Sequence, residues 1–170
     1  MKTDWWGGQR LTLLRVAILA CGIALSAPLS TTSHAAPDIP LARDFSEDGR
    51  AAHATQRVIV VLFSTGGCPW CQRVREEYLL PMLANPADAA RIIVREVDID
   101  GRAAIADFSG AATTHAAFAS RLEVRFAPTV QILGPGGEQL AAPLIGFGTA
   151  DYYGFYLDER IEAGLAKLRR

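Results

Sequence analysis

Two cysteines separated by two residues, Cys68 and Cys71, are the side chains of this sequence best suited to chemistry. They follow an apolar run at residues 58–63 and a glycine-containing loop at residues 64–67, and they precede a charged, helix-prone segment at residues 72–80. A buried strand, a glycine loop and a helix that begins at a Cys-x-x-Cys pair form the layout of a dithiol redox site. The first turn of a helix offers free backbone N–H groups and the positive end of the helix dipole, which favour the reactive thiolate. The spacing therefore predicts thiol-disulfide exchange.

Each residue of this motif has an expected role. Cys68 comes first and lies closer to the helix dipole, so its thiolate is expected to attack a disulfide, and Cys71, one turn later, to resolve the mixed disulfide. Pro69 suits the first helical turn because it needs no N–H partner there. Gly67 belongs to the same active-site loop. Trp70 is interpreted either as a surface for partner contact or as a partly buried anchor, and both interpretations remain open.

The alternatives to a redox pair are a structural disulfide and a metal site. A disulfide that closes so short a loop constrains the unfolded chain by only about 2 kcal/mol, so a purely structural role brings little benefit. Closed zinc sites usually need four ligands, and besides Cys68 and Cys71 the chain after residue 35 offers only His53 and His115, which have no finger-like spacing. We therefore expect no metal ion and no bound cofactor.

Residues 1–35 have the features of a secretory signal peptide. A basic start precedes an apolar run at residues 16–29, which is interrupted by Pro28 and is too short for a membrane-spanning helix. Ser33 and Ala35 are small residues at the two positions that a signal peptidase reads. The sequence therefore predicts a soluble protein exported to the periplasm or a similar compartment.

Cleavage after Ala35 would leave residues 36–170, a length that suits one domain with its own hydrophobic core. A lipoprotein anchor at Cys21 is the alternative, and it is disfavoured because only about five apolar residues separate Arg15 from this cysteine. The formal net charge of −1 indicates neither a nucleic-acid partner nor an anionic-membrane surface, and no membrane span is expected after cleavage.

Hydrophobic periodicity predicts that helices and strands alternate along residues 36–170. The strand at residues 57–63 is a continuous run of mainly β-branched residues, which indicates burial on both faces of an α/β sheet. The helix that carries the cysteines is expected to reach about Leu80, where Pro81 ends or kinks it. No structure is assigned to residues 101–110. The other expected elements are a helix at 41–56, a helical turn at 85–88, a strand at 91–99, a helix at 111–122, a strand at 125–133, a return arm at 138–145 and a helix at 152–168.

This order of elements and three local motifs make the chain resemble the thioredoxin superfamily. The motifs are the Cys-Pro-Trp-Cys site, the stretch at residues 126–130 that is similar to the family's cis-proline loop, and Gly146 after the hairpin. The resemblance implies a thioredoxin fold of the α/β class: a central mixed sheet with a C-terminal hairpin, flanked by helices. It also implies a cis bond before Pro128, a proline ring beside the cysteines, and an Ala127 backbone free to pair with substrate. Trp70, Ala127 and Pro128 are thus the expected substrate-binding residues.

Within the superfamily, the chain is most similar to exported, thioredoxin-related proteins of the SoxW type. The residues that carry this similarity are Gly146, Phe147 and residues 151–157. This similarity implies a protein-disulfide oxidoreductase that reduces disulfide-containing proteins and receives electrons from a membrane dithiol donor. Three alternatives remain: an oxidase, a glutaredoxin-like enzyme, for which a Cys-Pro-aromatic-Cys site is typical, and a non-catalytic binding module on the same fold.

One position departs from the family pattern. Many cytoplasmic thioredoxins carry a buried carboxylate six residues before the first cysteine, where this chain has Leu62, so the proton route must differ. Arg73 and Arg75 could support a thiolate, but we expect both on a solvated helix face, together with the surface charges Glu76 and Glu77.

Overall fold

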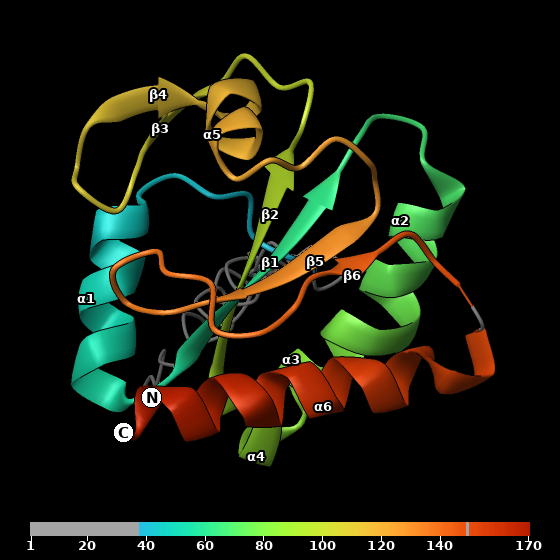
Figure 1. Cartoon of the computed structure of the whole chain (residues 1–170). Coiled ribbons are helices and arrows are strands. Elements are labelled where there is room, and N and C mark those ends of the chain that lie inside the picture. Colours follow the sequence, from blue (N-terminus) through green and yellow to red (C-terminus); the bar gives the residue numbers. More distant parts are fainter. Residues whose placement is uncertain (1–37, 149) are drawn as a thin grey trace, which may run out of the picture. The chain divides into compact units, whose positions relative to one another are not determined.

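The computed structural model describes residues 38–148 and 150–170 (Figure 1). The predicted signal peptide at residues 1–35, with Cys21, lies outside the described residues. The elements are α1 (Phe45–Thr55), β1 (Val58–Ser64), α2 (Pro69–Val74), the π-helical turn η1 (Arg75–Leu79), α3 (Leu80–Ala84), α4 (Pro86–Ala89), β2 (Ile92–Asp98), β3 (Ala104–Ala106), β4 (Ala112–Thr114), α5 (His115–Arg121), β5 (Thr129–Leu133), β6 (Leu144–Ile145) and α6 (Ala150–Leu168).

The main sheet is mixed, with the strand order β2-β1-β5-β6. Strand β1 runs parallel to β2, and the segment from α2 to α4 makes the crossover between them. Strand β5 runs antiparallel to β1, and β6 runs antiparallel to β5. This arrangement confirms the predicted α/β thioredoxin fold, with a parallel half and a C-terminal hairpin.

The sheet buries apolar side chains on both faces, because every side chain of β1 is buried, as predicted. On one face Leu62 packs in a cluster with Val74 of α2 and Leu157 of α6. On the other face Phe63 packs in a second cluster that includes Phe45 of α1 and residues of α5. Helices α2, α3 and α6 thus cover one face, whereas α1 and α5 cover the other.

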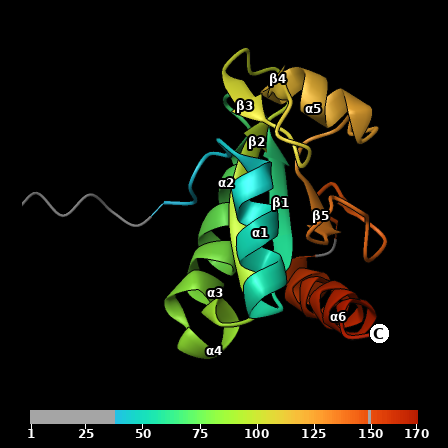
Figure 2. The same ribbon diagram turned by 90° about the vertical axis from the view of Figure 1, so that its left-hand side faces the viewer.

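The region between β2 and β5 differs from the prediction. Residues 101–110, which had no predicted structure, contain β3, and the expected helix at 111–122 begins with β4, which pairs with β3 as a separate two-stranded sheet. Helix α5 starts only at His115, where the hydroxyl of Thr114 caps it by accepting a hydrogen bond from the N–H of Ala117. Figures 1 and 2 both show β3, β4 and α5 gathered beyond the carboxyl ends of β1 and β2.

The N-terminal helix is shorter than the predicted range 41–56. The residues before α1 extend along the edge of β2, where Leu41 forms a parallel bridge to Glu96 and the N–H of Ala42 donates to the Glu96 carbonyl at 2.8 Å. Helix α1 begins after Asp44, whose carboxylate accepts a hydrogen bond from the N–H of Glu47. The extended segment therefore covers the outer edge of β2 beside Glu96.

The helical path of the site helix continues to Ala84, beyond the predicted end near Leu80. Pro81 has no N–H to donate, and its ring crowds the preceding turn of a regular helix. The chain adopts the wider π-helical turn η1 just before this proline, where the N–H of Leu80 donates to the Arg75 carbonyl. The helix changes its hydrogen-bonding pattern at this point and does not end.

Candidate active site

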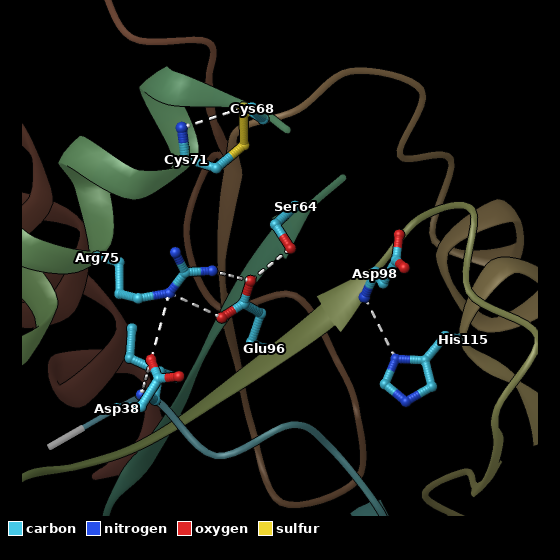
Figure 3. Close-up of polar contacts among 9 residues, drawn as sticks. Asp38, Ser64, Cys68, Cys71, Arg75, Glu96, Asp98 and His115 are labelled. Atoms are coloured by element: carbon cyan, nitrogen blue, oxygen red, sulfur yellow. Dashed lines mark hydrogen bonds and ion pairs between the residues drawn. A yellow bond between two sulfur atoms is a disulfide. The ribbon is translucent and has the colours of Figure 1, made fainter. Parts of the chain in front are cut away.

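Cys68 and Cys71 form a disulfide at the start of α2, with an S–S distance of 2.08 Å and a Cα–Cα distance of 5.3 Å (Figure 3). Cys68 is the N-cap residue of the helix and has an extended backbone. Its Sγ accepts a hydrogen bond from the N–H of Cys71 at 3.1 Å. The same N–H group would stabilise a thiolate at Cys68 in the reduced protein.

The two sulfurs differ in their access to solvent. Cys68 is half-buried, whereas Cys71 is 2% exposed. An external disulfide can therefore reach the first cysteine, and the second can act only on a partner that is already bound to the first. This difference fits the roles predicted for the two residues.

The loop before the cysteines depends on glycine. Gly67 has a φ of +70°, a conformation that side chains other than glycine rarely adopt, and no atom lies within 4 Å of the place where its Cβ would stand. Gly67 therefore turns the chain from β1 into α2 and leaves the space beside Cys68 open. Pro69 follows as the first helical residue and is exposed, as the sequence predicted.

Trp70 lies on an aromatic cluster and is also available at the surface. Its ring stacks on Phe147 with a centroid distance of 5.5 Å, and Phe147 in turn packs against Tyr78 and Tyr153. The guanidinium of Arg73 lies 4.8 Å from the centre of the Phe147 ring. Trp70 remains 51% exposed, so its ring is anchored on Phe147 on one side and open to solvent on the other, and contact with a partner stays a prediction.

The Ala127–Pro128 peptide bond is cis, which confirms the prediction for this bond. Pro128 is buried and Ala127 is half-buried. The N–H of Gly146 donates to the Pro128 carbonyl at 2.7 Å, and Phe147, which follows directly, stacks on Trp70. The segment 146–147 thus links the proline loop to the Cys-Pro-Trp-Cys motif.

A cavity of about 510 Å³ opens beside the disulfide. Both cysteines line it, together with Ser64 at the end of β1, Arg75 of η1 and Glu96 of β2. It therefore joins the sulfurs to a polar group of side chains that lies behind them.

Glu96 is a buried carboxylate that the sequence reasoning missed. It is 5% exposed, and its Oε1 accepts a hydrogen bond from the hydroxyl of Ser64 at 2.5 Å. Arg75 binds it through two nitrogens, Nη2 to Oε1 and Nε to Oε2, the latter at 3.1 Å. Burial lowers the pKa of Arg75, but the hydrogen bonds and charge of Glu96 outweigh this effect and raise that pKa above its ordinary value.

The prediction that Arg75 lies on a solvated helix face was therefore wrong. Its side chain is only 24% exposed because the inward face of the helix packs over β2. Arg73, in contrast, has a side chain that is 41% exposed and pairs with Glu77 at 2.7 Å. Glu76 and Glu77 are exposed, so both lie at the surface as predicted.

The sequence did contain a signal for Glu96. Alternate residues of a strand share one face, so Ile92, Val94 and Glu96 of β2 point to the same side of the sheet. A carboxylate in line with two apolar residues on one face of a predicted strand indicates an internal charge that needs a partner.

The structure also bears on metal ligands, on the two histidines and on membrane-spanning helices. Among residues 38–148 and 150–170, no group of three or more His, Cys, Asp and Glu side chains is positioned to hold a metal ion. His53 is exposed, and His115 is buried, where its Nδ1 accepts from the N–H of Asp98 at 3.2 Å. None of the helices described is both long and apolar enough to cross a lipid bilayer.

The match to a family profile agrees with the fold. The family profile described as Thioredoxin-like domain matches residues 45–159, whereas no curated protein matches the sequence. A poplar thioredoxin h mutant shares 19% identity over 78% of this chain and 92% of its own, with a TM-score of 0.49. The oxidised mitochondrial thioredoxin 3 of Saccharomyces cerevisiae shares 18% identity over 73% of this chain and 93% of its own, with a TM-score of 0.45. A mutant thioredoxin of Halobacterium salinarum NRC-1 shares 21% identity over 75% of this chain and 95% of its own, also with a TM-score of 0.45.

Proposed function

The chain belongs to the thioredoxin-like domain family, and on this premise we propose that it is a thiol-disulfide oxidoreductase that reduces disulfide bonds of other proteins. The observation that carries the proposal is the paired cysteine site at a helix start. There the half-buried Cys68 receives an N–H hydrogen bond and Cys71 is enclosed behind it. The arrangement is consistent with a reactive first cysteine and a resolving second cysteine.

The reaction begins with both cysteines reduced. The Cys68 thiolate attacks one sulfur of the substrate disulfide, whose S–S bond breaks, and the departing substrate thiolate takes a proton from water. Cys71 then loses its proton and attacks the Cys68 sulfur, so the mixed disulfide breaks and the second substrate thiolate leaves and is protonated. Two electrons have passed to the substrate, and the Cys68–Cys71 disulfide seen in the structure is the product.

Trp70, Ala127 and Pro128 are proposed to bind the substrate around this sulfur. Trp70 supports this role because half of its surface is exposed while its ring is anchored on Phe147. Ala127 has a small side chain, so an extended substrate segment can approach its backbone. A strand of substrate added at this place would be held by main-chain hydrogen bonds, which tolerate different sequences.

The protein is further proposed to act after export, as a SoxW-type relative that a membrane dithiol donor reduces again. We expect the exported protein to begin at Ala36, because the basic start, the apolar run and the small residues before this position suit a signal peptidase. N-terminal sequencing of protein recovered from the periplasm measures this. A lipid-modified Cys21 at the new N-terminus would instead establish a membrane anchor.

Reduction of insulin by dithiothreitol, followed by turbidity, tests the proposed activity. The purified protein is expected to raise the rate of precipitation at least about tenfold over dithiothreitol alone, as activated thiolates exchange faster than an unactivated one. Parallel assays with a glutathione mixed disulfide and with a reduced, unfolded protein test the glutaredoxin-like and oxidase alternatives. An insulin rate equal to that of dithiothreitol alone would rule out the reductase.

A further inference from the structure

An ion pair between the partly buried Arg75 and the buried Glu96 lines the cavity beside the disulfide. Arg75 and Glu96 point toward each other beneath the helical turn that carries the cysteines (Figure 3). Arg75 follows Cys71 by four residues and donates its backbone N–H to the Cys71 carbonyl, so both residues lie on the same side of the helix. Glu96 and both cysteines line one cavity.

Glu96 is a buried carboxylate that lies beside Leu62 in the sheet. Strand β1 pairs with β2 so that Leu62 is the direct partner of Glu96, one strand away. The Glu96 side chain is 7% exposed and that of Arg75 is 24% exposed, so water screens these charges less than it screens charges on the surface. Each of the two charges therefore acts on the sulfurs more strongly than a surface charge would.

Three further acidic side chains lie around this pair. Asp38 approaches Arg75 Nε at 3.5 Å, but its side chain is 75% exposed, so solvent screens its charge. Asp98 lies on the cavity wall, and Glu76 is exposed on the outer side of the helix. Among the residues described, Glu96 is thus the principal partner of the Arg75 charge.

We propose that Arg75 and Glu96 are positioning residues that neutralise each other's charge beside Cys68 and Cys71, so that neither charge alone shifts the redox equilibrium of the two cysteines. The inference rests on the proposed dithiol function. A negative thiolate exists only in the reduced protein, so an uncompensated Arg75 cation stabilises the reduced state. An uncompensated Glu96 anion destabilises the reduced state. The pair keeps these opposite effects in balance.

The test is the equilibrium with glutathione, in which the reduced protein and one glutathione disulfide yield the protein disulfide and two glutathione thiols. Two electrons and two protons pass from the cysteines to glutathione, so the equation is balanced. The fraction of free thiols is measured at fixed ratios of the two glutathione forms. The equilibrium constant then gives the reduction potential.

Glu96→Gln is the main variant, since the amide keeps the shape of the side chain and removes its charge. We expect the equilibrium to shift about tenfold toward the dithiol, which corresponds to a potential about 30 mV less negative.

Arg75→Gln leaves a buried carboxylate unpaired, and we expect the opposite shift, but loss of a buried partner can also unfold the chain. The double variant Arg75→Gln with Glu96→Gln removes both charges, and its equilibrium is expected within about twofold of the native value.

A matched control lies on the other face of the sheet, in helix α1. Asp48 is 6% exposed and pairs with Arg95. Arg95 precedes Glu96 on β2, so the side chain of Arg95 points to the opposite face of the sheet from that of Glu96. Asp48→Asn removes an equally buried charge away from the sulfurs and is expected to leave the equilibrium within about twofold of native.

The outcomes separate this inference from the proposed function. A native protein that never equilibrates with glutathione would overturn both. A native protein that equilibrates, with Glu96→Gln unchanged or with the double variant shifted as far as Glu96→Gln, would overturn the inference alone. A shift in Asp48→Asn equal to that in Glu96→Gln would do the same, since it would show a general effect of buried charge loss.

Discussion

Replacing Cys68 with serine is expected to abolish disulfide reduction, and replacing Cys71 with serine is expected to trap substrates as mixed disulfides. A serine hydroxyl does not ionise near neutral pH and cannot form a disulfide, so Cys68→Ser leaves no group able to attack. Cys71→Ser retains the attacking thiolate but loses the thiol that releases the substrate. The rate of insulin reduction in both variants should fall to that of dithiothreitol alone, a loss of at least about tenfold.

The two variants serve as controls for each other. Both remove the disulfide, so any effect of the lost cross-link on stability is shared, whereas covalent complexes on a non-reducing gel are expected only with Cys71→Ser. Full insulin turnover by Cys68→Ser would refute the assignment of the first cysteine. Complexes formed by Cys68→Ser and not by Cys71→Ser would show that the order of the two roles is reversed.

Phe45→Ala is expected to lower the free energy of unfolding by about 3–5 kcal/mol, as is usual when a large side chain is removed from a core. Phe45 is fully buried, and its ring stacks on Phe118 with a centroid distance of 4.4 Å and on Phe108 with a distance of 5.0 Å. It joins α1 to α5 on the sheet face opposite α2. Since small domains are stable by only about 5–15 kcal/mol, this one truncation removes a large share of the total.

Urea denaturation of the oxidised protein, followed by circular dichroism, measures the effect. Phe155→Ala is the matched control, because Phe155 is also a phenylalanine but is 66% exposed on α6. Its truncation should change the unfolding free energy by less than about 0.5 kcal/mol. A loss below about 1 kcal/mol in Phe45→Ala would mean that the stacked rings do not form a tightly packed core.

The parts of the fold that could be predicted are those where one local property determines the outcome. The continuous apolar run before the cysteines predicted a strand buried on both faces, and β1 is such a strand. Strand β2 and helix α6 likewise lie within two residues of their predicted ranges. In each case periodicity and packing favour the same structure, so the pattern in the sequence is sufficient.

The parts that could not be predicted depend on partners distant in the sequence. Ala112 lies in a segment that the apolar pattern predicted to be helical, but it pairs with Ala106 in the β3–β4 sheet, where Thr113 and Thr114 suit a strand better than a helix. Arg75 lies among exposed charges in the sequence, and its burial follows only from the packing of η1 over β2 next to Glu96. The candidate site could therefore be predicted as two cysteines and a proline loop, without the charged pair behind them.

The burial of Cys71 has a consequence for how electrons enter and leave the protein. Cys71 is 2% exposed and Cys68 is half-buried, so in the proposed reaction the donor thiol is expected to attack the disulfide at Cys68, the same atom that later meets the substrate. Donor and acceptor must then take turns and cannot form a ternary complex on this domain. The proposed reaction is therefore expected to follow ping-pong kinetics. The donor reacts with the disulfide form of the site and the substrate with the dithiol form. Each partner is expected to inhibit the other competitively when it binds the form with which it does not react.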